Sequence, residues 1–387
     1  MIPYGRQEIT NDDIAEVEKV LRSDFLTQGP VITKFEKSVA NYCGSSHAIA
    51  VNSATSALHI ACLALNLGPG DWLWTSPNTF VASANCGLYC GANIDFVDID
   101  PETYNISTSA LSDKLIKAEK LGKLPKIVIP VHFGGHPCDM SKIFELSKKY
   151  GFKIIEDASH AIGASYENIK VGSCQHSDIT IFSFHPVKII TTGEGGMALT
   201  NNEILSNSMR RLSTHGITRD KKLMRERPND EIWNYQQIEL GFNYRITDFQ
   251  AALGLSQLNR LDKYVKSRHE IVKLYNSKFK NLNIQLPSQS TKIYSSYHLY
   301  PIRIKNSPTT TTQKQIYDAL WKKDIAANLL YVPLHRHPYY ENLGFKSGDF
   351  PESEQFHREV ICLPIFPKLT KDQQMIIVES LISILNK

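Results

Sequence analysis

Ser183-Phe184-His185-Pro186-Val187-Lys188, followed closely by Thr191-Thr192-Gly193-Glu194-Gly195-Gly196, places one lysine between an apolar run and a glycine-rich bend. The apolar run 179–182 ahead of it predicts a buried strand. Because Pro186 lacks the N–H that a strand ladder needs, the strand must end before it, and Lys188 must project from a loop beside the sheet. Lys188 is therefore the leading candidate for chemistry in this chain.

An acid stands at the exit of a second predicted strand. The run 153–157 has apolar Ile154 and Ile155 at its centre, and Glu156 and Asp157 fall where the strand leaves the sheet. A buried acid needs a cationic partner to stay charged, and an amine needs a low dielectric or a neighbouring cation to be nucleophilic near neutral pH. Pyridoxal phosphate meets both needs, because its aldehyde takes a lysine, its ring nitrogen an aspartate, and its phosphate amide and hydroxyl donors. The alternative is a surface lysine and a solvated acid, as most lysines and aspartates are.

Length and charge limit the classes of protein to consider. A chain of 387 residues can bury a large core and normally forms two domains. The net charge is only +4, from 43 basic and 39 acidic residues, without blocks of like charge, so neither nucleic acid nor a membrane surface is an expected partner. We find neither a signal-peptide core nor an apolar stretch of about 20 residues, and we expect a cytoplasmic protein.

The seven cysteines give no metal-binding pattern. They are scattered from Cys43 to Cys362 without a C-x-x-C pair, and we expect buried free thiols. His132 and His136 flank a Gly-Gly turn, but zinc would need further cysteine or histidine ligands nearby. No metal site is predicted.

Short apolar runs alternate with helical patterns through the first two-thirds of the chain. This alternation predicts a mixed, mostly parallel α/β sheet with helices on both faces. Ligands of such sheets bind beyond the carboxyl ends of the strands, where Asn52, Asp157 and Ser183 all fall. The predicted strands are 48–51, 72–74, 94–97, 127–131, 152–156 and 179–182, and the predicted helices are 55–65, 80–89, 111–121 and 140–150.

A long helical pattern over 247–279 follows and is expected to bridge two lobes. Beyond it, strands near 297–304 and 360–363 and helices near 313–322 and 371–385 indicate a smaller α+β lobe. We therefore predict a large cofactor-binding domain over 1–250, and a bridging helix with a small α+β domain over 251–387.

The segment 52–59 lies between a predicted strand and a helix. Its small residues let backbone N–H groups approach an anion at the helix start, which suits a phosphate. An ordinary helix N-cap at Ser53 or Thr55 explains the same residues equally well. Ser183 adds a second hydroxyl donor. Phe80, at the start of the next helix, could stack on a flat heteroaromatic ring, although a lone phenylalanine is more often a core residue.

Three motifs in this order resemble the DegT/DnrJ/EryC1/StrS aminotransferases of nucleotide-sugar biosynthesis. They are N-S-A-T-S-A-L, E-D-A-S-H-A-x-G and S-F-H-x-x-K-x-x-T-T-G-E-G-G, which begin at Asn52, Glu156 and Ser183. The resemblance covers nearly the whole chain and includes Pro3-Tyr4 and the segments 25–29, 241–245 and 331–335.

The resemblance implies the aspartate-aminotransferase fold, a homodimer with active sites at the subunit boundary, and L-glutamate as amino donor. Lys188 would form the Schiff base with pyridoxal phosphate and later move a proton, while Asp157 would keep the pyridine nitrogen protonated. His160 would lie near the phenolic oxygen of the cofactor, unless it is simply a core histidine. The remaining cofactor contacts would be Phe80 on the ring, Ser183, Thr55 and the Ala54 amide on the phosphate, and Asn243 on the phosphate of the other subunit's cofactor.

Substrate contacts follow from the resemblance alone. Arg245 would meet a carboxylate or pyrophosphate, and further matching positions are Tyr4, the turn of Asp24, Phe25, Leu26 and Thr27, and the residues Tyr331 and His335. The S-F-H-x-V-K motif and the Y-V-P-L-H segment resemble the UDP-4-amino-4,6-dideoxy-N-acetyl-β-L-altrosamine transaminases of pseudaminic acid synthesis. The expected substrate is then a UDP-linked 4-keto-6-deoxy-N-acetylhexosamine.

Other functions stay open. One alternative is a transaminase for a dTDP- or GDP-linked keto sugar, and another is a pyridoxal phosphate enzyme that acts on amino acids. Family relatives with histidine in place of the lysine are dehydrases, and Lys188 argues against that activity. A regulatory module on the same fold would normally carry an added DNA-binding segment, and we see none.

Overall fold

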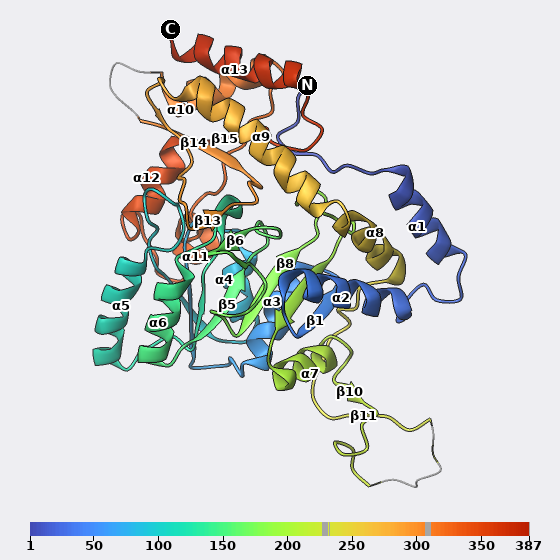
Figure 1. The fold of residues 1–387 in the computed structure, drawn as a ribbon. Helices are drawn as coiled ribbons and strands as arrows, with labels where there is room; N and C mark the ends of the chain where they lie inside the picture. Colours follow the sequence, from blue (N-terminus) through green and yellow to red (C-terminus); the bar gives the residue numbers. More distant parts are fainter. Residues whose placement is uncertain (227–230, 232, 306–310, 387) are drawn as a thin grey trace.

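A computed structural model describes residues 1–226, 231, 233–305 and 311–386. Its centre is a seven-stranded sheet in the order β1-β9-β8-β5-β4-β2-β3 (Figure 1). All neighbouring strands pair in parallel except β9, which is antiparallel to both β1 and β8. The mixed, mostly parallel sheet is thus confirmed. Its strands are β1 (His47–Val51), β2 (Trp72–Thr75), β3 (Asn93–Phe96), β4 (Ile127–Ile129), β5 (Lys153–Asp157), β8 (Ile179–Ser183) and β9 (Gly196–Thr200).

Helices cover both faces of this sheet because alternate strand residues point to opposite sides. In β5, Ile154 packs in a cluster with α5 and α6, whereas its neighbour Ile155 packs in a cluster with α3 and α4. A third cluster joins α2 to the same face as α5 and α6, through Phe182 of β8. The helices are α2 (Pro30–Cys43), α3 (Ala54–Ala64), α4 (Ala82–Tyr89), α5 (Thr108–Leu121), α6 (Met140–Tyr150) and α7 (Glu203–Leu212).

The observed elements differ little from the predicted ranges in this half. β4 ends at Ile129 instead of residue 131, since Pro130 has no N–H to donate. The predicted helix 80–89 begins at Ala82, and the predicted helix 111–121 begins earlier, at Thr108, where Ser107 caps it by accepting from the N–H of Ala110.

The predicted helix 247–279 is wrong as a single element. The structure divides it into α8 (Asp248–Leu258) and α9 (Leu261–Phe279). Arg260 lies at the break, and its Nη2 is 2.6 Å from Oδ1 of buried Asp13 in α1 (Asn11–Leu21). The partner of Arg260 is thus 247 positions away in the sequence, which no local pattern reveals.

The second half of the chain forms a smaller core. Residues of α9 from Ile271 onward pack with β14, β15, α10 and α13, and Ile2 from the N-terminus joins them. In Figure 1 these helices gather at one end of the molecule, near both termini. The predicted strand 297–304 is shorter, as β14 begins at Tyr300. The elements are β12 (Ile284–Gln285), β14 (Tyr300–Ile304), α10 (Gln313–Lys322), α11 (Pro338–Glu341), α12 (Pro351–Glu359), β15 (Val360–Leu363) and α13 (Lys371–Leu385).

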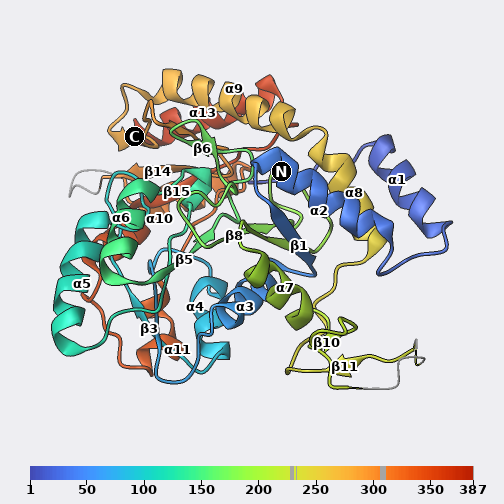
Figure 2. The same cartoon turned by 60° about the horizontal axis from the view of Figure 1, so that its bottom comes forward.

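Short elements complete the fold. β10 (Ile217–Thr218) and β11 (Gln236–Gln237) lie on an arm that projects from the body in both views (Figure 2). β6 (Ser165–Tyr166), β7 (Ile169–Lys170) and β13 (Ile293–Tyr294) form a small sheet of their own. All seven cysteines are buried and free, as predicted. Within the described ranges, no helix is long and apolar enough to cross a bilayer, and no cluster of three or more metal-binding side chains occurs.

Candidate active site

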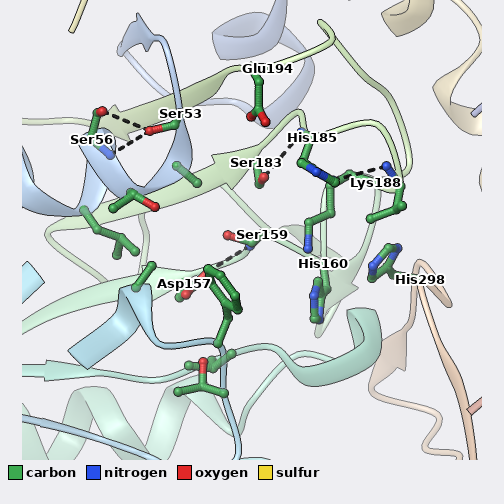
Figure 3. Close-up of a pocket in the computed structure, with 18 of the residues that line it drawn as sticks. Ser53, Ser56, Asp157, Ser159, His160, Ser183, His185, Lys188, Glu194 and His298 are labelled. Atoms are coloured by element: carbon green, nitrogen blue, oxygen red, sulfur yellow. Dashed lines mark hydrogen bonds between the residues drawn. The ribbon is translucent and has the colours of Figure 1, made fainter. Parts of the chain in front are cut away.

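A cavity of about 710 Å³ lies at the carboxyl edge of the central sheet (Figure 3). The ends of β5 and β8, the start of α3 and the loop after β8 form its floor, and Leu330 and Tyr331 close it from the second half of the chain. Nine of the predicted site residues line it together: Tyr4, Ala54, Thr55, Phe80, Asp157, His160, Ser183, Lys188 and Tyr331.

Lys188 reaches this cavity from the loop that the sequence predicted. β8 ends at Ser183, Pro186 follows, and the N–H of Lys188 donates to the carbonyl of His185 at 2.9 Å. Burial lowers the pKa of the Lys188 amine to about 8, and the nearby Asp157 carboxylate opposes this shift. A larger fraction of this amine than of an ordinary lysine is therefore uncharged near neutral pH and available as a nucleophile or base.

Asp157 is the last residue of β5, and its side chain is only 5% exposed. Its carboxylate accepts from the Ser83 hydroxyl at 2.6 Å and from the Ser159 N–H at 3.1 Å. Among the described residues, no cation lies within salt-bridge distance of it. A buried carboxylate without a cation suits the protonated ring nitrogen of pyridoxal phosphate, so the site fits the cofactor at this point.

The start of α3 fits the phosphate end of the cofactor. Ser53 caps the helix by accepting from the N–H of Ser56 at 3.1 Å, while the amides of Ala54 and Thr55 have no carbonyl partner inside the helix. Gly196 of β9 packs so closely here that a Cβ would lie 2.4 Å from the Ala54 nitrogen. Gly196 also pairs with Ser183 in β8, so β9 brings the Ser183 hydroxyl and the α3 amides to one place.

His160 forms the wall beside Lys188. Its Nδ1 accepts from the N–H of Gly134 at 3.3 Å, which leaves the proton on Nε2, 3.3 Å from the Tyr331 hydroxyl. Burial, together with the charge of Lys188, lowers the pKa of His160 well below its usual value, so the imidazole is neutral. Phe80 is 58% exposed at the rim and has its ring 6.4 Å from that of Tyr331.

Several predicted substrate residues, and the predicted cofactor residue Asn243, do not line this cavity. The turn of Asp24, Phe25, Leu26 and Thr27 is exposed, and Thr27 forms a bridge with Thr247. Asn243 is exposed and Arg245 half-buried, beside the end of β1, where Arg245 bridges to Val51. None of these residues is among those that line the cavity of their own chain.

His335 differs from its expected position. Its side chain is fully buried, and Nε2 lies 2.9 Å from Oε1 of Glu354 in α12. The short helix η2 (Leu334–Arg336) carries it into the core against Phe350, so in this structure it is a core residue and not a lining residue.

The cavity also contains residues to which the sequence assigned no role. His185 and Glu194 lie in the motif around Lys188, and their place in that motif was the available signal. Gln250 is positioned by its amide, which donates to the carbonyl of Glu194 at 2.9 Å. His298 comes from the second half of the chain, and no local pattern marks it.

The family model of the DegT/DnrJ/EryC1/StrS aminotransferases matches residues 7–382. The chain belongs to this family. It is 36% identical to the UDP-4-amino-4,6-dideoxy-N-acetyl-beta-L-altrosamine transaminase of Campylobacter jejuni, over 100% of this chain and 98% of that protein. It is also 36% identical to the GDP-perosamine synthase of Caulobacter vibrioides, over 89% of this chain and 87% of that protein.

Solved structures agree over the whole fold. PseC of Helicobacter pylori, an aminotransferase involved in the biosynthesis of pseudoaminic acid, superposes with a TM-score of 0.89 at 31% identity, over 100% of this chain and 99% of PseC. The PLP form of Spr1654, a candidate sugar aminotransferase of Streptococcus pneumoniae, gives a TM-score of 0.88 at 29% identity, over 99% and 98% of the two chains. This protein is thus a sugar aminotransferase of the family, with pyridoxal phosphate as its cofactor.

Proposed function

We propose that this protein transfers the amino group of L-glutamate to C4 of a UDP-linked 4-keto-6-deoxy-N-acetylhexosamine, a step of pseudaminic acid biosynthesis. The observation that carries the aminotransferase chemistry is the pairing of Lys188, with its lowered pKa, and the uncompensated Asp157 in one cavity. Similarity to the Campylobacter jejuni transaminase and to PseC supports the UDP-sugar.

Different residues of the cavity would hold different parts of the cofactor. Ser183, Thr55 and the Ala54 amide would hold the phosphate, Phe80 would lie on the ring, and Asp157 would keep the ring nitrogen protonated. When bound, the cofactor supplies an electron sink for the carbon that loses its proton.

Lys188 is the proton carrier in this proposal. Because its amine is uncharged above about pH 8, it can take a proton from the α-carbon of the amino donor and return one to the former keto carbon of the sugar. His160, neutral and protonated on Nε2, would donate a hydrogen bond toward the phenolic oxygen of the cofactor.

We also propose a cytoplasmic homodimer with shared active sites. Asn243 would reach the cofactor phosphate of the partner subunit, which its exposed position in the single chain permits. Arg245 and the turn 24–27 would meet the pyrophosphate of the nucleotide at the cavity mouth of the partner, because guanidinium groups bind phosphates in a bidentate manner. The division into domains 1–250 and 251–387 remains a prediction.

Two experiments test the chemistry and the substrate separately. Borohydride reduction of the cofactor-loaded protein should attach the cofactor to the peptide that contains Lys188, and attachment elsewhere would refute the lysine assignment. A panel of UDP-, dTDP- and GDP-linked 4-amino-6-deoxy sugars, each with 2-oxoglutarate, should release glutamate fastest with the UDP-linked compound.

A GDP-linked sugar is the second candidate substrate, since the GDP-perosamine synthase has the same 36% identity over most of its length. Preference for GDP or dTDP sugars in the panel would overturn the UDP assignment and leave the aminotransferase assignment unchanged. Release of no glutamate from any sugar, with turnover of free amino acids instead, would favour an enzyme acting on amino acids.

A further inference from the structure

The segment before β14 is fastened to the wall of the cavity. The N–H groups of Ser296 and Leu299 donate to the carbonyls of Gly135 and Gly134, at 3.1 and 3.2 Å. The Ser296 hydroxyl donates to the carbonyl of His160 at 2.7 Å. A stretch from the second half of the chain thus has a fixed position beside a predicted active-site residue.

A buried arginine fixes the same segment from behind. Arg268 of α9 is only 2% exposed, and its Nη1 donates to the carbonyls of Tyr297, His298 and Ile365 at 3.1, 3.2 and 3.0 Å. Within the described part of the chain no carboxylate pairs with it. The Nη1 bonds of the guanidinium all go to backbone carbonyls, and one of them holds the main chain of His298 in place.

The ring of His298 completes the cavity wall. It is 4% exposed, and its centroid lies 4.4 Å from that of His160. Figure 3 shows the side chains of His298, His160 and Lys188 turned toward one another, at the end of the cavity away from Ser53. His298 therefore lies next to Lys188, the residue proposed to move protons at the reacting carbon.

The imidazole of His298 is neutral, with its proton on Nε2. Burial, together with His160 and the charges of Lys188 and Arg268, lowers the pKa of His298 well below its usual value. Its Nδ1 is sealed from solvent and has no hydrogen-bond partner among the described residues. Because an orphaned N–H is rarer in proteins than an orphaned acceptor, the proton belongs on Nε2, the nitrogen able to reach a ligand.

We propose that His298 is a further substrate-binding residue, whose Nε2–H donates a hydrogen bond to an oxygen on the carbon next to the reacting carbon. Given the proposed function, this oxygen belongs either to the α-carboxylate of the amino donor or to a ring hydroxyl of the sugar. No arginine is among the described residues that line the cavity, and Lys188 is its only lysine, so neutral donors must meet such oxygens within one subunit.

The test uses His298→Phe and His298→Gln in the cofactor-loaded protein. Calorimetry measures the affinity for two unreactive probes, glutarate for the donor and UDP-N-acetylglucosamine for the sugar. We expect His298→Phe to weaken one probe by about tenfold or more, and His298→Gln to recover part of the loss, because an amide restores a donor. The probe that weakens identifies which oxygen His298 contacts. His47→Phe, at the start of β1 and outside the cavity, is the matched control.

A second variant, at Arg268, distinguishes the loss of the His298 contact from a folding defect. Arg268→Met, which has no N–H donor for the three carbonyls, should displace His298 and weaken the same probe while leaving the affinity for pyridoxal phosphate within about twofold. Wild-type affinity of both His298 variants for both probes would overturn the proposal, as would losses that follow the melting temperature instead of the side chain. Failure of the wild-type protein to convert glutamate would instead refute the proposed function.

Discussion

Replacing Asp157 with Asn separates an electronic role for this carboxylate from a structural one. The shape of the side chain is kept, and the amide can be accommodated: its oxygen accepts from the Ser159 N–H, and its nitrogen donates to the Ser83 hydroxyl. Ser83 can then pass its own proton to Thr79, whose Oγ1 lies 2.8 Å away. The fold should therefore tolerate the change.

The expected loss of activity follows from burial. Asp157 is 5% exposed, so its pairing with a cationic ring nitrogen takes place away from solvent. Removing one partner of a buried ion pair costs on the order of 3 kcal/mol or more. Since about 1.4 kcal/mol corresponds to a factor of ten in rate, turnover should fall by roughly 100-fold or more.

The stability of the cofactor-free Asp157→Asn variant should be equal to or greater than that of the cofactor-free wild type. Without the cofactor, the Asp157 carboxylate is buried with no cation within salt-bridge distance among the described residues, and the neutral amide removes that desolvation penalty. Thermal unfolding of the cofactor-free variant should thus occur at or above the wild-type temperature. The control is Asp318→Asn, at an exposed acid paired with Lys314 in α10, which should change neither quantity.

Single-turnover absorbance with glutamate measures the rate of turnover, and thermal unfolding of the cofactor-free protein measures its unfolding temperature. Turnover of Asp157→Asn within about threefold of wild type would refute the electronic role. A variant that unfolds at a much lower temperature without cofactor would show that the carboxylate serves the fold instead.

Three further outcomes are expected. Acylation of Lys188 in cofactor-free protein should rise with pH with a midpoint near pH 8, because burial lowers its pKa to about 8; a midpoint near the ordinary 10.5 would contradict this. Heterodimers of Lys188→Ala with Asn243→Ala chains should partly recover activity, as one pocket is then wild type, and no recovery in verified heterodimers would argue against the shared site. Gly196→Ala should cost about 1–3 kcal/mol in unfolding free energy and weaken cofactor binding, since its Cβ meets the Ala54 nitrogen at 2.4 Å, whereas Gly68→Ala, with open space around it, is the control.

Local patterns predicted the part of the fold that depends on local chemistry. Strands buried on both faces are apolar throughout, and the parallel arrangement places their carboxyl ends at one edge. That rule alone brought Asp157 and Ser183 to one cavity, and Pro186 predicted the loop from which Lys188 enters it. The role of β9 was not predicted, because a single strand gives no sign of its direction or neighbours.

What could not be predicted depends on contacts between distant parts of the chain. At the helix break Arg260 binds Asp13 from α1, and Arg268 and the loop at Gly134 hold the backbone that brings His298 to the cavity. The motif match at His335 did not reveal its surroundings, since a matching residue can equally be held in the core by a hydrogen bond such as that between Nε2 and Glu354.

The N-terminal segment has a consequence for synthesis on the ribosome. Asp248 accepts hydrogen bonds from the N–H groups of Gly29 and Val31, and Ile2 bridges to Ile325. The start of α2 at Gly29 therefore lacks its hydrogen-bond partner until 219 further residues have been translated, which at about 5–20 residues per second takes roughly 10 to 45 s. Throughout that interval the N-terminal segment is available to chaperones. Its contacts with Asp248 and Ile325 can form only after these two residues leave the ribosome.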